Sequence, residues 1–316
     1  MKIVCVEPIG ISQSLAEEFK SLFAQKGHEF VWYADRKEDI NTLIDRMRDA
    51  DAVIISNIKL PKEVLSVCAH LKMLSVAFTG YDHIDMDYCR EHNICVCNAS
   101  GYATVAVAEL AVGLMLDVYR HITSLDGNTR SGGTRNNFLG RQLYGKTVGI
   151  VGTGAIGRQT ALLLKAMGCN VQAWSRSVRK EMTDAGIPYV DLDTLMRTSD
   201  IISLHVPLNK ETNHLISAEK LALCKPTAIL INTARGNVVD MDALAVALKE
   251  GRLSGAGIDV FEKEPPLATD HALLNVPNCV VVPHVGYATR EAFDIRIGIV
   301  IDNINAWLKG KPINLV

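Results

Sequence analysis

The stretch Thr147–Gly157, with the sequence TVGIVGTGAIG, decides how the middle of this chain folds. Its first residues predict a buried strand, and Arg158–Met167 behind it predicts a helix that Gly168 closes. The turn between them has the pattern G-x-G-x-x-G and consists of Gly152, Thr153, Gly154, Ala155, Ile156 and Gly157. A pyrophosphate binds the backbone N–H groups of such a helix start, and a Cβ at Gly152 or Gly154 would obstruct its approach. The turn therefore predicts a dinucleotide site, and a ligand-free strand–helix turn is the alternative.

Short apolar runs alternate with helical patterns on both sides of this turn, which indicates parallel strands joined by crossover helices. The strands predicted from the turn onward are Thr147–Val151, Asn170–Trp174, Ile201–Leu204, Ala228–Ile231, Gly255–Ile258 and Val280–Val282. Those predicted before it are Lys2–Val6, Phe30–Tyr33, Ala52–Ser56, Met73–Ala77 and Ile94–Cys97. The pattern predicts an α/β protein with two doubly wound parallel sheets. We expect an irregular excursion at Asp126–Gly145 and a last helix, Glu291–Leu308, that packs on the first domain.

The composition narrows the class of protein. Of 316 residues 48% are hydrophobic, and 33 Lys and Arg nearly balance 35 Asp and Glu, which argues against binding to nucleic acid or to an anionic membrane. The eight cysteines are scattered without a C-x-x-C pair, which favours free buried thiols over disulfides or a metal site. The start of the chain lacks a signal-peptide pattern, and we find no membrane-spanning run, so we expect a cytoplasmic protein.

The end of the second strand after the turn bears on the choice of cofactor. An NAD site usually places Asp or Glu here to bind the ribose 2′-hydroxyl. This chain has Ser175 and Arg176 instead, so nothing repels a 2′-phosphate and Arg176 has the charge to pair with one. We therefore favour NADP over NAD. The alternative is that Arg176 covers the adenine face of either cofactor.

Three ionisable residues follow later strands at the edge where open parallel sheets bind ligands. They are Arg235, Glu264 and His284. An arginine binds a carboxylate through two parallel hydrogen bonds, and a histidine beside a carboxylate exchanges protons near neutral pH. Reduction of a 2-oxo acid needs both functions, so the three residues together predict this chemistry.

Several segments resemble the D-isomer-specific 2-hydroxyacid dehydrogenases, a family that includes glyoxylate/hydroxypyruvate reductase, phosphoglycerate dehydrogenase, D-lactate dehydrogenase and formate dehydrogenase. They are Ala77–Asp85 (AFTGYDHID), Val107–Leu110 (VAEL), Asn232–Gly236 (NTARG), Gly257–Pro265 (GIDVFEKEP) and Pro283-His284. The resemblance implies a flavodoxin-like substrate domain, residues 1–100 plus 288–316. A Rossmann NAD(P)-binding domain, residues 101–287, would be inserted into this substrate domain.

The resemblance also implies a role for individual residues. Arg235 would hold the substrate carboxylate together with the backbone N–H groups of Thr79 and Gly80. His284 would be the acid and base, and Glu264 would orient it and stabilise its protonated form. Asp259 would hold the nicotinamide carboxamide. The remaining residues along the cofactor would be His205, Val206, Pro207 and Thr233, although the His205 side chain has a purely structural use as its alternative.

The activity implied is reduction of a small 2-oxo acid, of the glyoxylate or hydroxypyruvate type, to the D-2-hydroxy acid by a homodimer that needs no metal. Two alternatives stay open: a phosphoglycerate dehydrogenase-type enzyme, and a dinucleotide-sensing, corepressor-like binding protein of the same fold. The family implies that the dimer forms through the helix near Thr104–His121 and the Asp126–Gly145 segment.

Overall fold

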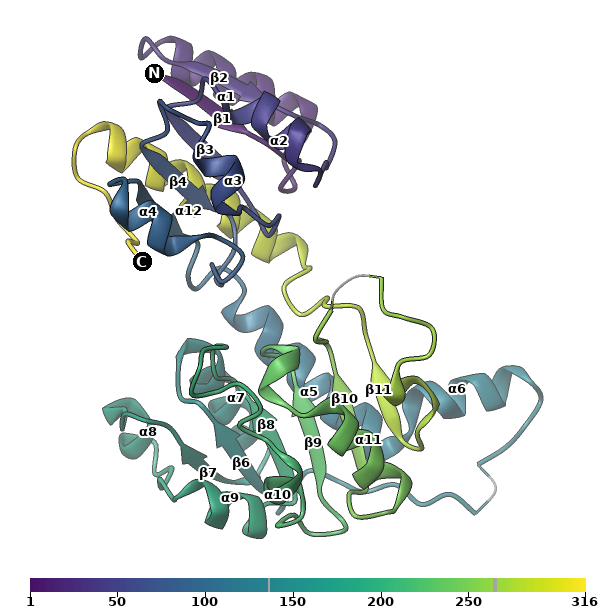
Figure 1. Cartoon of the computed structure of the whole chain (residues 1–316). Coiled ribbons are helices and arrows are strands. Elements are labelled where there is room, and N and C mark those ends of the chain that lie inside the picture. Colours follow the sequence, from purple (N-terminus) through teal and green to yellow (C-terminus); the bar gives the residue numbers. More distant parts are fainter. Residues whose placement is uncertain (136, 264–265) are drawn as a thin grey trace. The chain divides into compact units, whose positions relative to one another are not determined.

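The chain forms two compact units in the computed structural model, which describes residues 1–135, 137–263 and 266–316 (Figure 1). Unit 1 consists of Met1–Ala103 and Thr289–Val316, and unit 2 consists of Thr104–Ala288. Unit 2 is therefore an insertion into the sequence of unit 1. Each unit contains a parallel sheet with helices, which confirms the predicted α/β class.

Unit 1 has the flavodoxin-like strand order. Its described residues form a five-stranded sheet in the order β2-β1-β3-β4-β5, in which every neighbouring pair is parallel. The strands are β1 (Lys2–Cys5), β2 (Glu29–Trp32), β3 (Ala52–Ile55), β4 (Met73–Val76) and β5 (Cys95–Asn98). The helices are α1 (Gln13–Ala24), α2 (Ile40–Met47), α3 (Lys62–Leu65), α4 (Met86–Glu91) and α12 (Arg290–Leu308).

The last helix, α12, packs on the sheet of unit 1, as predicted. The Ser75 hydroxyl donates to the Val300 carbonyl at 3.2 Å, and the Asn303 side-chain amide donates to the Asn98 carbonyl at 3.0 Å. Asn303 is fully buried, so these bonds satisfy polar groups that water cannot reach. They tie the end of the chain to the strands that precede the insertion.

Unit 2 contains the second parallel sheet. Its described residues form six strands in the order β11-β10-β9-β8-β6-β7. The strands are β6 (Thr147–Val151), β7 (Asn170–Trp174), β8 (Ile201–Leu204), β9 (Ile229–Asn232), β10 (Gly255–Ile258) and β11 (Cys279–Val281). The helical segments are α5 (Thr104–Arg120), α6 (Ile122–Arg130), α7 (Ala155–Ala166), α8 (Lys180–Asp184), α9 (Leu192–Thr198), α10 (Ala218–Leu221), η1 (Gly236–Val238), α11 (Met241–Lys249) and η2 (Ala272–Asn275).

The winding direction of the sheet switches at β6. Strand β7 pairs on one side of β6 and β8 pairs on the other, so the chain winds in opposite directions from this point. Ligands of open α/β sheets bind at such a switch, outside the carboxyl ends of the strands. Beyond β7, Tyr189 pairs with Ala173 in a single parallel bridge. The strand patterns did not predict this bridge, because a single paired residue has no alternation of apolar and polar neighbours.

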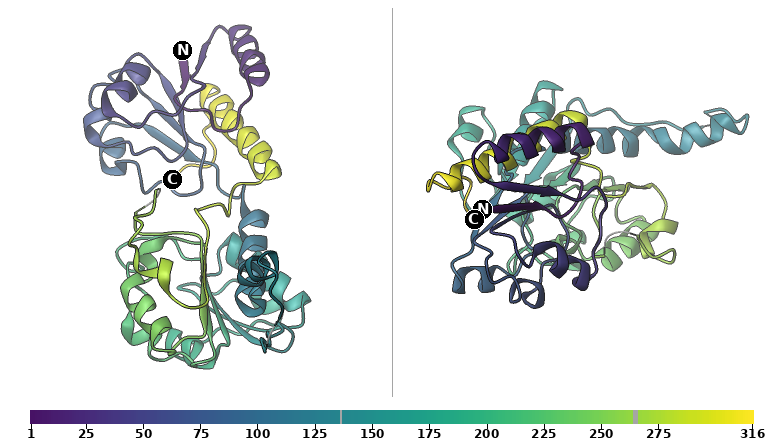
Figure 2. Two further views of the ribbon diagram at one scale, coloured as in Figure 1. Left: turned by 90° about the vertical axis from the view of Figure 1, so that its right-hand side faces the viewer. Right: turned by 90° about the horizontal axis from the view of Figure 1, so that it is seen from above.

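The predicted irregular excursion at Asp126–Gly145 is partly wrong, because its first residues belong to α6. His121 adopts a left-handed conformation with φ of 51° and separates α5 from α6. The α6 sequence, ITSLDGNTR, is mostly polar and contains Gly127, so it does not favour a helix over a loop. Figure 2 shows α6 extending past the other elements of unit 2 in its right-hand view.

Three general features of the described residues bear on function. No helix among them is long and apolar enough to cross a bilayer. They contain no group of three or more His, Cys, Asp and Glu side chains arranged to hold a metal ion. The eight cysteines are all free thiols.

Candidate functional site

The glycine turn at the carboxyl end of β6 has no room for side chains. Gly152 has a φ of 99°, and a Cβ there would lie 2.7 Å from the His205 carbonyl oxygen. A Cβ on Gly157 would lie 2.0 Å from the Gly152 carbonyl oxygen. Both contacts are far below van der Waals distance, so the close approach of β6, α7 and the end of β8 requires glycine at both positions.

The N-terminus of α7 is open. Its N-cap residue is Gly154, and no side chain caps the first turn. Gly154 and Ala155 are exposed, and Ile156 is half-buried. The α7 helix has twelve residues, and the N–H groups and partial positive charge of its first turn favour an anion. This end of the helix fits a pyrophosphate.

The turn is anchored by Tyr189, a residue that the sequence analysis missed. The Tyr189 hydroxyl donates to the buried Thr153 hydroxyl at 2.9 Å and accepts the Arg179 backbone N–H at 3.1 Å. A partly buried tyrosine needs a hydrogen-bond partner for its hydroxyl, but the sequence alone does not say which. Tyr189 thus connects the glycine turn to the loop that follows β7.

Ser175 and Arg176 lie in that loop, directly after β7. Ser175 is half-buried, and Arg176 is exposed and pairs with Glu211 at 2.7 Å. An ion pair between side chains this exposed contributes about 0–1 kcal/mol, so Arg176 is released at little cost. The carboxylate of Glu211 competes with any other anion for this guanidinium.

His205, Val206 and Pro207 follow β8, and the first two lie against the glycine turn. The His205 imidazole lies 2.9 Å from the Ser203 hydroxyl and packs beneath the turn, with its Cβ 3.1 Å from the position of a Gly157 Cβ. Burial lowers the pKa of His205 to about 4, so the ring is neutral at physiological pH. Val206 is buried and Pro207 is exposed. In this arrangement the His205 side chain supports the turn.

Thr233, at the end of β9, carries an orphaned hydroxyl. The side-chain oxygen is buried and has no hydrogen-bond partner in the described part of the chain. A buried hydroxyl without a partner costs about 1–3 kcal/mol, and a polar ligand group bound beside it would remove that cost. The glycine cradle, the open helix and this hydroxyl together fit a dinucleotide.

The loop that carries Arg235 is organised by Asn232, which the sequence analysis did not single out. The Asn232 side chain donates to the Arg235 carbonyl at 2.9 Å and accepts the Ala234 N–H at 3.0 Å. An Asn at a strand end commonly makes such a turn, so a signal was present. Gly236 lets the loop pack against the segment after β10, because a Cβ there would lie 2.0 Å from the Phe261 carbonyl carbon.

His284 follows β11 and borders a small cavity in unit 2. The cavity has a volume of about 160 Å³ and is lined by Phe261, Lys263, Leu267, Val281, Val282, Pro283 and His284. The His284 backbone is left-handed, with φ of 53°, and its ring contacts the Tyr287 ring edge to face at 5.5 Å between centroids. Asp259, at the end of β10, is buried and faces the same segment. Glu264 lies outside the described residues.

Thr79 and Gly80 belong to unit 1, where they follow β4. Thr79 is exposed, and its carbonyl accepts the Asn98 side-chain amide at 2.8 Å. Asn98 ends β5, so it ties this loop to the neighbouring strand. All the other predicted site residues that the structure describes belong to unit 2.

Known proteins are similar to this chain in the unit that carries the glycine turn. Residues 112–286 match the family described as "D-isomer specific 2-hydroxyacid dehydrogenase, NAD binding domain". The chain belongs to this dehydrogenase family. It is an NAD(P)-dependent enzyme family, as the motifs predicted, and the match covers most of unit 2 with its glycine turn.

Individual relatives of this dehydrogenase are similar over most of its length. It is 42% identical to the glyoxylate reductase of Thermococcus litoralis over 90% of this chain and 89% of the relative. It is 36% identical to the D-3-phosphoglycerate dehydrogenase of Methanocaldococcus jannaschii over 95% of this chain and 57% of that protein. Among solved structures, an acyclic imino acid reductase (Bsp5) in complex with NADPH and D-Arg superposes with a TM-score of 0.90, at 31% identity and full coverage of both chains.

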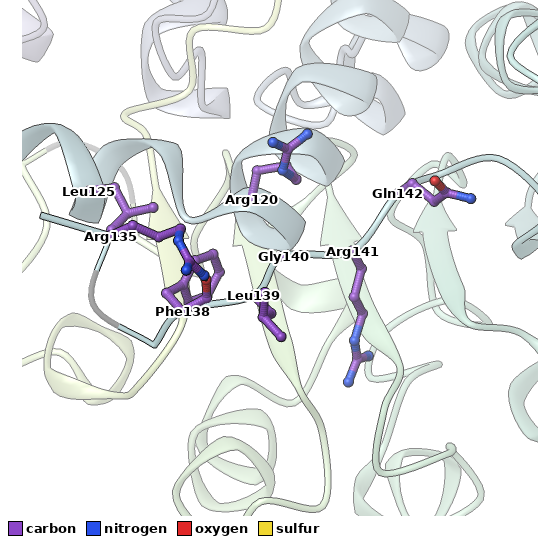
Figure 3. Close-up of a pocket in the computed structure, with 8 residues that line it drawn as sticks. All are labelled: Arg120, Leu125, Arg135, Phe138, Leu139, Gly140, Arg141 and Gln142. Atoms are coloured by element: carbon purple, nitrogen blue, oxygen red, sulfur yellow. The ribbon is translucent and has the colours of Figure 1, made fainter.

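The dehydrogenase has a second cavity away from these residues, between α5, α6 and the segment that follows (Figure 3). It has a volume of about 390 Å³ and is lined by Arg120, Leu125, Arg135, Phe138, Leu139, Gly140, Arg141 and Gln142. Figure 3 shows Arg120 and Arg141 pointing in different directions, and Arg141 donates to the Thr227 carbonyl at 2.6 Å. The arginines do not converge on one point, so the cavity lacks the arrangement of an anion site.

Proposed function

We propose that this dehydrogenase reduces a small 2-oxo acid, of the glyoxylate or hydroxypyruvate type, to the D-2-hydroxy acid, using NADPH in preference to NADH. One observation carries the proposal. Arg235 and His284 follow β9 and β11 at the edge of the sheet that also carries the glycine turn, and their loops both contact the segment after β10. The similarity to glyoxylate reductases supports the choice of substrate class.

Arg235 is the proposed clamp for the substrate carboxylate. A guanidinium binds a carboxylate through two parallel charged hydrogen bonds, which orients the adjacent carbonyl carbon as well as holding the acid. The Asn232 turn restricts the Arg235 backbone and so limits the positions that the guanidinium reaches. The backbone N–H groups of Thr79 and Gly80 are the proposed further donors to the same carboxylate.

His284 is the proposed proton donor to the keto oxygen. As the carbonyl carbon accepts a hydride, negative charge develops on the oxygen, and a protonated imidazole beside it neutralises that charge. Glu264 is the proposed partner that orients His284 and stabilises its protonated form. The cavity beside His284, about 160 Å³, is small and largely apolar in its lining, which suits a substrate with a short side chain.

The residues proposed to hold the dinucleotide come from five strand ends of unit 2. The turn Gly152–Gly157 with the α7 N-terminus binds the pyrophosphate, and Ser175 and Arg176 bind the adenosine ribose or its 2′-phosphate. His205, Val206 and Pro207, beside the glycine turn, are proposed to contact the cofactor through their backbone and apolar atoms. The Thr233 hydroxyl and Asp259 lie on the nicotinamide side. When bound, the nicotinamide supplies or accepts the hydride.

Steady-state kinetics with a panel of 2-oxo acids, each run with NADH and with NADPH, tests this proposal. We expect the highest kcat/KM for glyoxylate or hydroxypyruvate with NADPH. A higher kcat/KM with NADH would overturn the cofactor preference. Dinucleotide binding without turnover of any acid would favour the corepressor-like alternative.

A phosphoglycerate dehydrogenase-type activity is the second candidate. Lys59, in the loop after β3, is exposed and makes no ion pair within the described residues, so its charge is available to a second anionic group on a substrate. The similarity to D-3-phosphoglycerate dehydrogenases supports the same possibility. Including 3-phosphohydroxypyruvate in the panel decides between the two, because this candidate requires it to be the preferred acid.

We infer further that two copies associate through α6 and the segment that follows it. Apolar side chains stand exposed there: Leu139 is 82%, Tyr144 is 70% and Ile122 is 54% accessible. Large apolar side chains that are exposed on α6 and on the segment after it favour an interaction surface over a solvated face. A second copy of the chain is the occupant we propose, since it presents the same apolar groups and a twofold interface is self-complementary.

A further inference from the structure

The segment that carries His284 is held in an unfavourable backbone conformation. A residue other than glycine in the left-handed region costs on the order of 1 kcal/mol, and the His284 φ of 53° lies in that region. Such a conformation persists only where the surroundings impose it. The contacts of the segment therefore identify what holds the imidazole in place.

Three hydrogen bonds to the segment come from one residue at the end of β10. The His284 N–H is shared with the Val282 carbonyl at 3.1 Å, and the His284 ring contacts the Tyr287 ring. The Asp259 carboxylate accepts the Val285 N–H at 2.7 Å through one oxygen and the Gly286 N–H at 2.9 Å through the other. The Asp259 carbonyl accepts the His284 N–H at 2.8 Å. Three consecutive N–H groups of the segment thus end on a single residue, which is only 1% exposed.

We propose that Asp259 is a positioning residue that holds His284 in its left-handed turn through these backbone bonds. The inference rests on the proposed role of His284 and assigns Asp259 a function separate from a contact with the cofactor. Charged acceptors make stronger hydrogen bonds than neutral ones, and burial of the carboxylate strengthens them further. The imidazole is thereby oriented before substrate binds, which removes an ordering cost from the reaction.

Gly286 provides a second way to disturb the same contact. A Cβ on Gly286 would lie 2.9 Å from the Asp259 Oδ2 atom, so Gly286→Ala displaces the carboxylate from the segment without changing its charge. Asp259→Asn weakens the same hydrogen bonds by changing the acceptor, because the amide nitrogen of asparagine cannot accept an N–H. Gly113→Ala is the matched control, since a Cβ at this exposed position of α5 meets nothing within 4 Å.

The test measures kcat, KM for the 2-oxo acid, the Kd of NADPH, and hydrogen–deuterium exchange of peptides spanning 282–288. We expect both Asp259→Asn and Gly286→Ala to speed exchange of these peptides and to lower kcat, by roughly 100-fold for Asp259→Asn. Gly113→Ala should change none of these values.

The outcomes separate the two roles of Asp259. Unchanged exchange and kcat in Gly286→Ala, with Asp259→Asn raising only the Kd of NADPH, would overturn the positioning role and leave a cofactor contact alone. The exchange measurement needs no turnover. It therefore still decides the proposal if the wild-type protein reduces none of the acids, a result that would contradict only the proposed function.

Discussion

Arg235 illustrates how a single side chain combines charge with a fixed position. Its guanidinium already donates to the Ala234 carbonyl at 2.8 Å, and the Asn232 side chain fixes the backbone on both sides of it. Lysine would keep the positive charge but lose the two parallel N–H donors. Replacing Arg235 by lysine therefore distinguishes the effect of the charge from that of the paired donors.

Arg235→Ala should raise KM for the 2-oxo acid roughly 10- to 100-fold, since a hydrogen-bonded charge pair contributes about 1.5–3 kcal/mol. Arg235→Lys should recover part of this loss. Initial-rate kinetics at saturating cofactor measure both. An unchanged KM in Arg235→Ala would contradict the carboxylate clamp.

Arg176 and Glu211 offer a test of cofactor preference. Arg176→Ala should raise KM for NADPH about tenfold, with little effect on NADH, because only the former carries a 2′-phosphate. Glu211→Gln should lower KM for NADPH, since it removes the competing carboxylate 2.7 Å away. Lys180→Ala, which removes an exposed cation paired with Asp184, is the control. Equal effects of Arg176→Ala on both cofactors would refute the preference.

The buried His205 imidazole should make the free energy of unfolding depend on pH. Its pKa in the folded state is lowered to about 4 by burial, so between the ordinary value near 6.5 and about 4 only the unfolded chain takes up the proton. Folding stability therefore falls as the pH drops through this window. His205→Gln removes this titrating group. On going from pH 7 to pH 5, the variant should therefore lose roughly 2 kcal/mol less of its free energy of unfolding than the wild type loses. Urea unfolding at both pH values measures this, with exposed His70→Gln as control, and equal losses would show the assignment to be wrong.

Among the elements, the strand–turn–helix unit β6–α7 depends on contacts that no single side chain makes. Gly152 and Gly157 are required because β8 and the turn backbone lie directly against them. Tyr189, from the edge position beside β7, completes the unit through Thr153. Cofactor binding and the local packing of unit 2 are therefore coupled at this turn.

Gly157→Ala should destabilise the protein by about 1–3 kcal/mol, as overpacking does, and should weaken dinucleotide binding. The reason is the 2.0 Å approach of its Cβ to the Gly152 carbonyl oxygen. Thermal unfolding and cofactor titration measure the two effects. Gly298→Ala, an exposed position within α12 where a Cβ meets nothing within 4 Å, should leave both unchanged. A stable variant with normal cofactor affinity would contradict the tight turn.

Considered as a whole, the molecule is two doubly wound units with the second inserted into the sequence of the first. The insertion begins at Thr104, where α5 starts, and ends at Ala288, four residues after His284. The proposed association of two copies is a property of this scale.

Ile122→Asp combined with Leu139→Asp should halve the mass measured by light scattering during size-exclusion chromatography. A charge at these exposed apolar positions would be desolvated in an interface but is harmless in water. Val67→Asp, at an exposed apolar position of unit 1, should leave the mass unchanged. If the wild-type chain already runs with the mass of one copy, the proposed interface is refuted.

Much of the fold followed from local patterns. The strands, their parallel sheets and the glycine turn were predictable because apolar runs and glycine positions act over a few neighbouring residues. The helical start of the Asp126–Gly145 segment was not, because the α6 sequence is mostly polar and contains Gly127, a composition that is also typical of a loop. Arg235 and His284 were predicted as site residues from their places after strands and from motifs, and their roles stay predictions.

The order of residues along the chain determined the class of fold, the family and the candidate chemistry, since each depends on short motifs with a local physical cause. Only the tertiary structure decided that Tyr189 supports Thr153, that His205 packs beneath the turn, and that Asp259 accepts the N–H groups of the His284 segment. These contacts join residues 25 to 50 positions apart or depend on how strands are ordered in a sheet, and strand order is set by packing that no local pattern encodes.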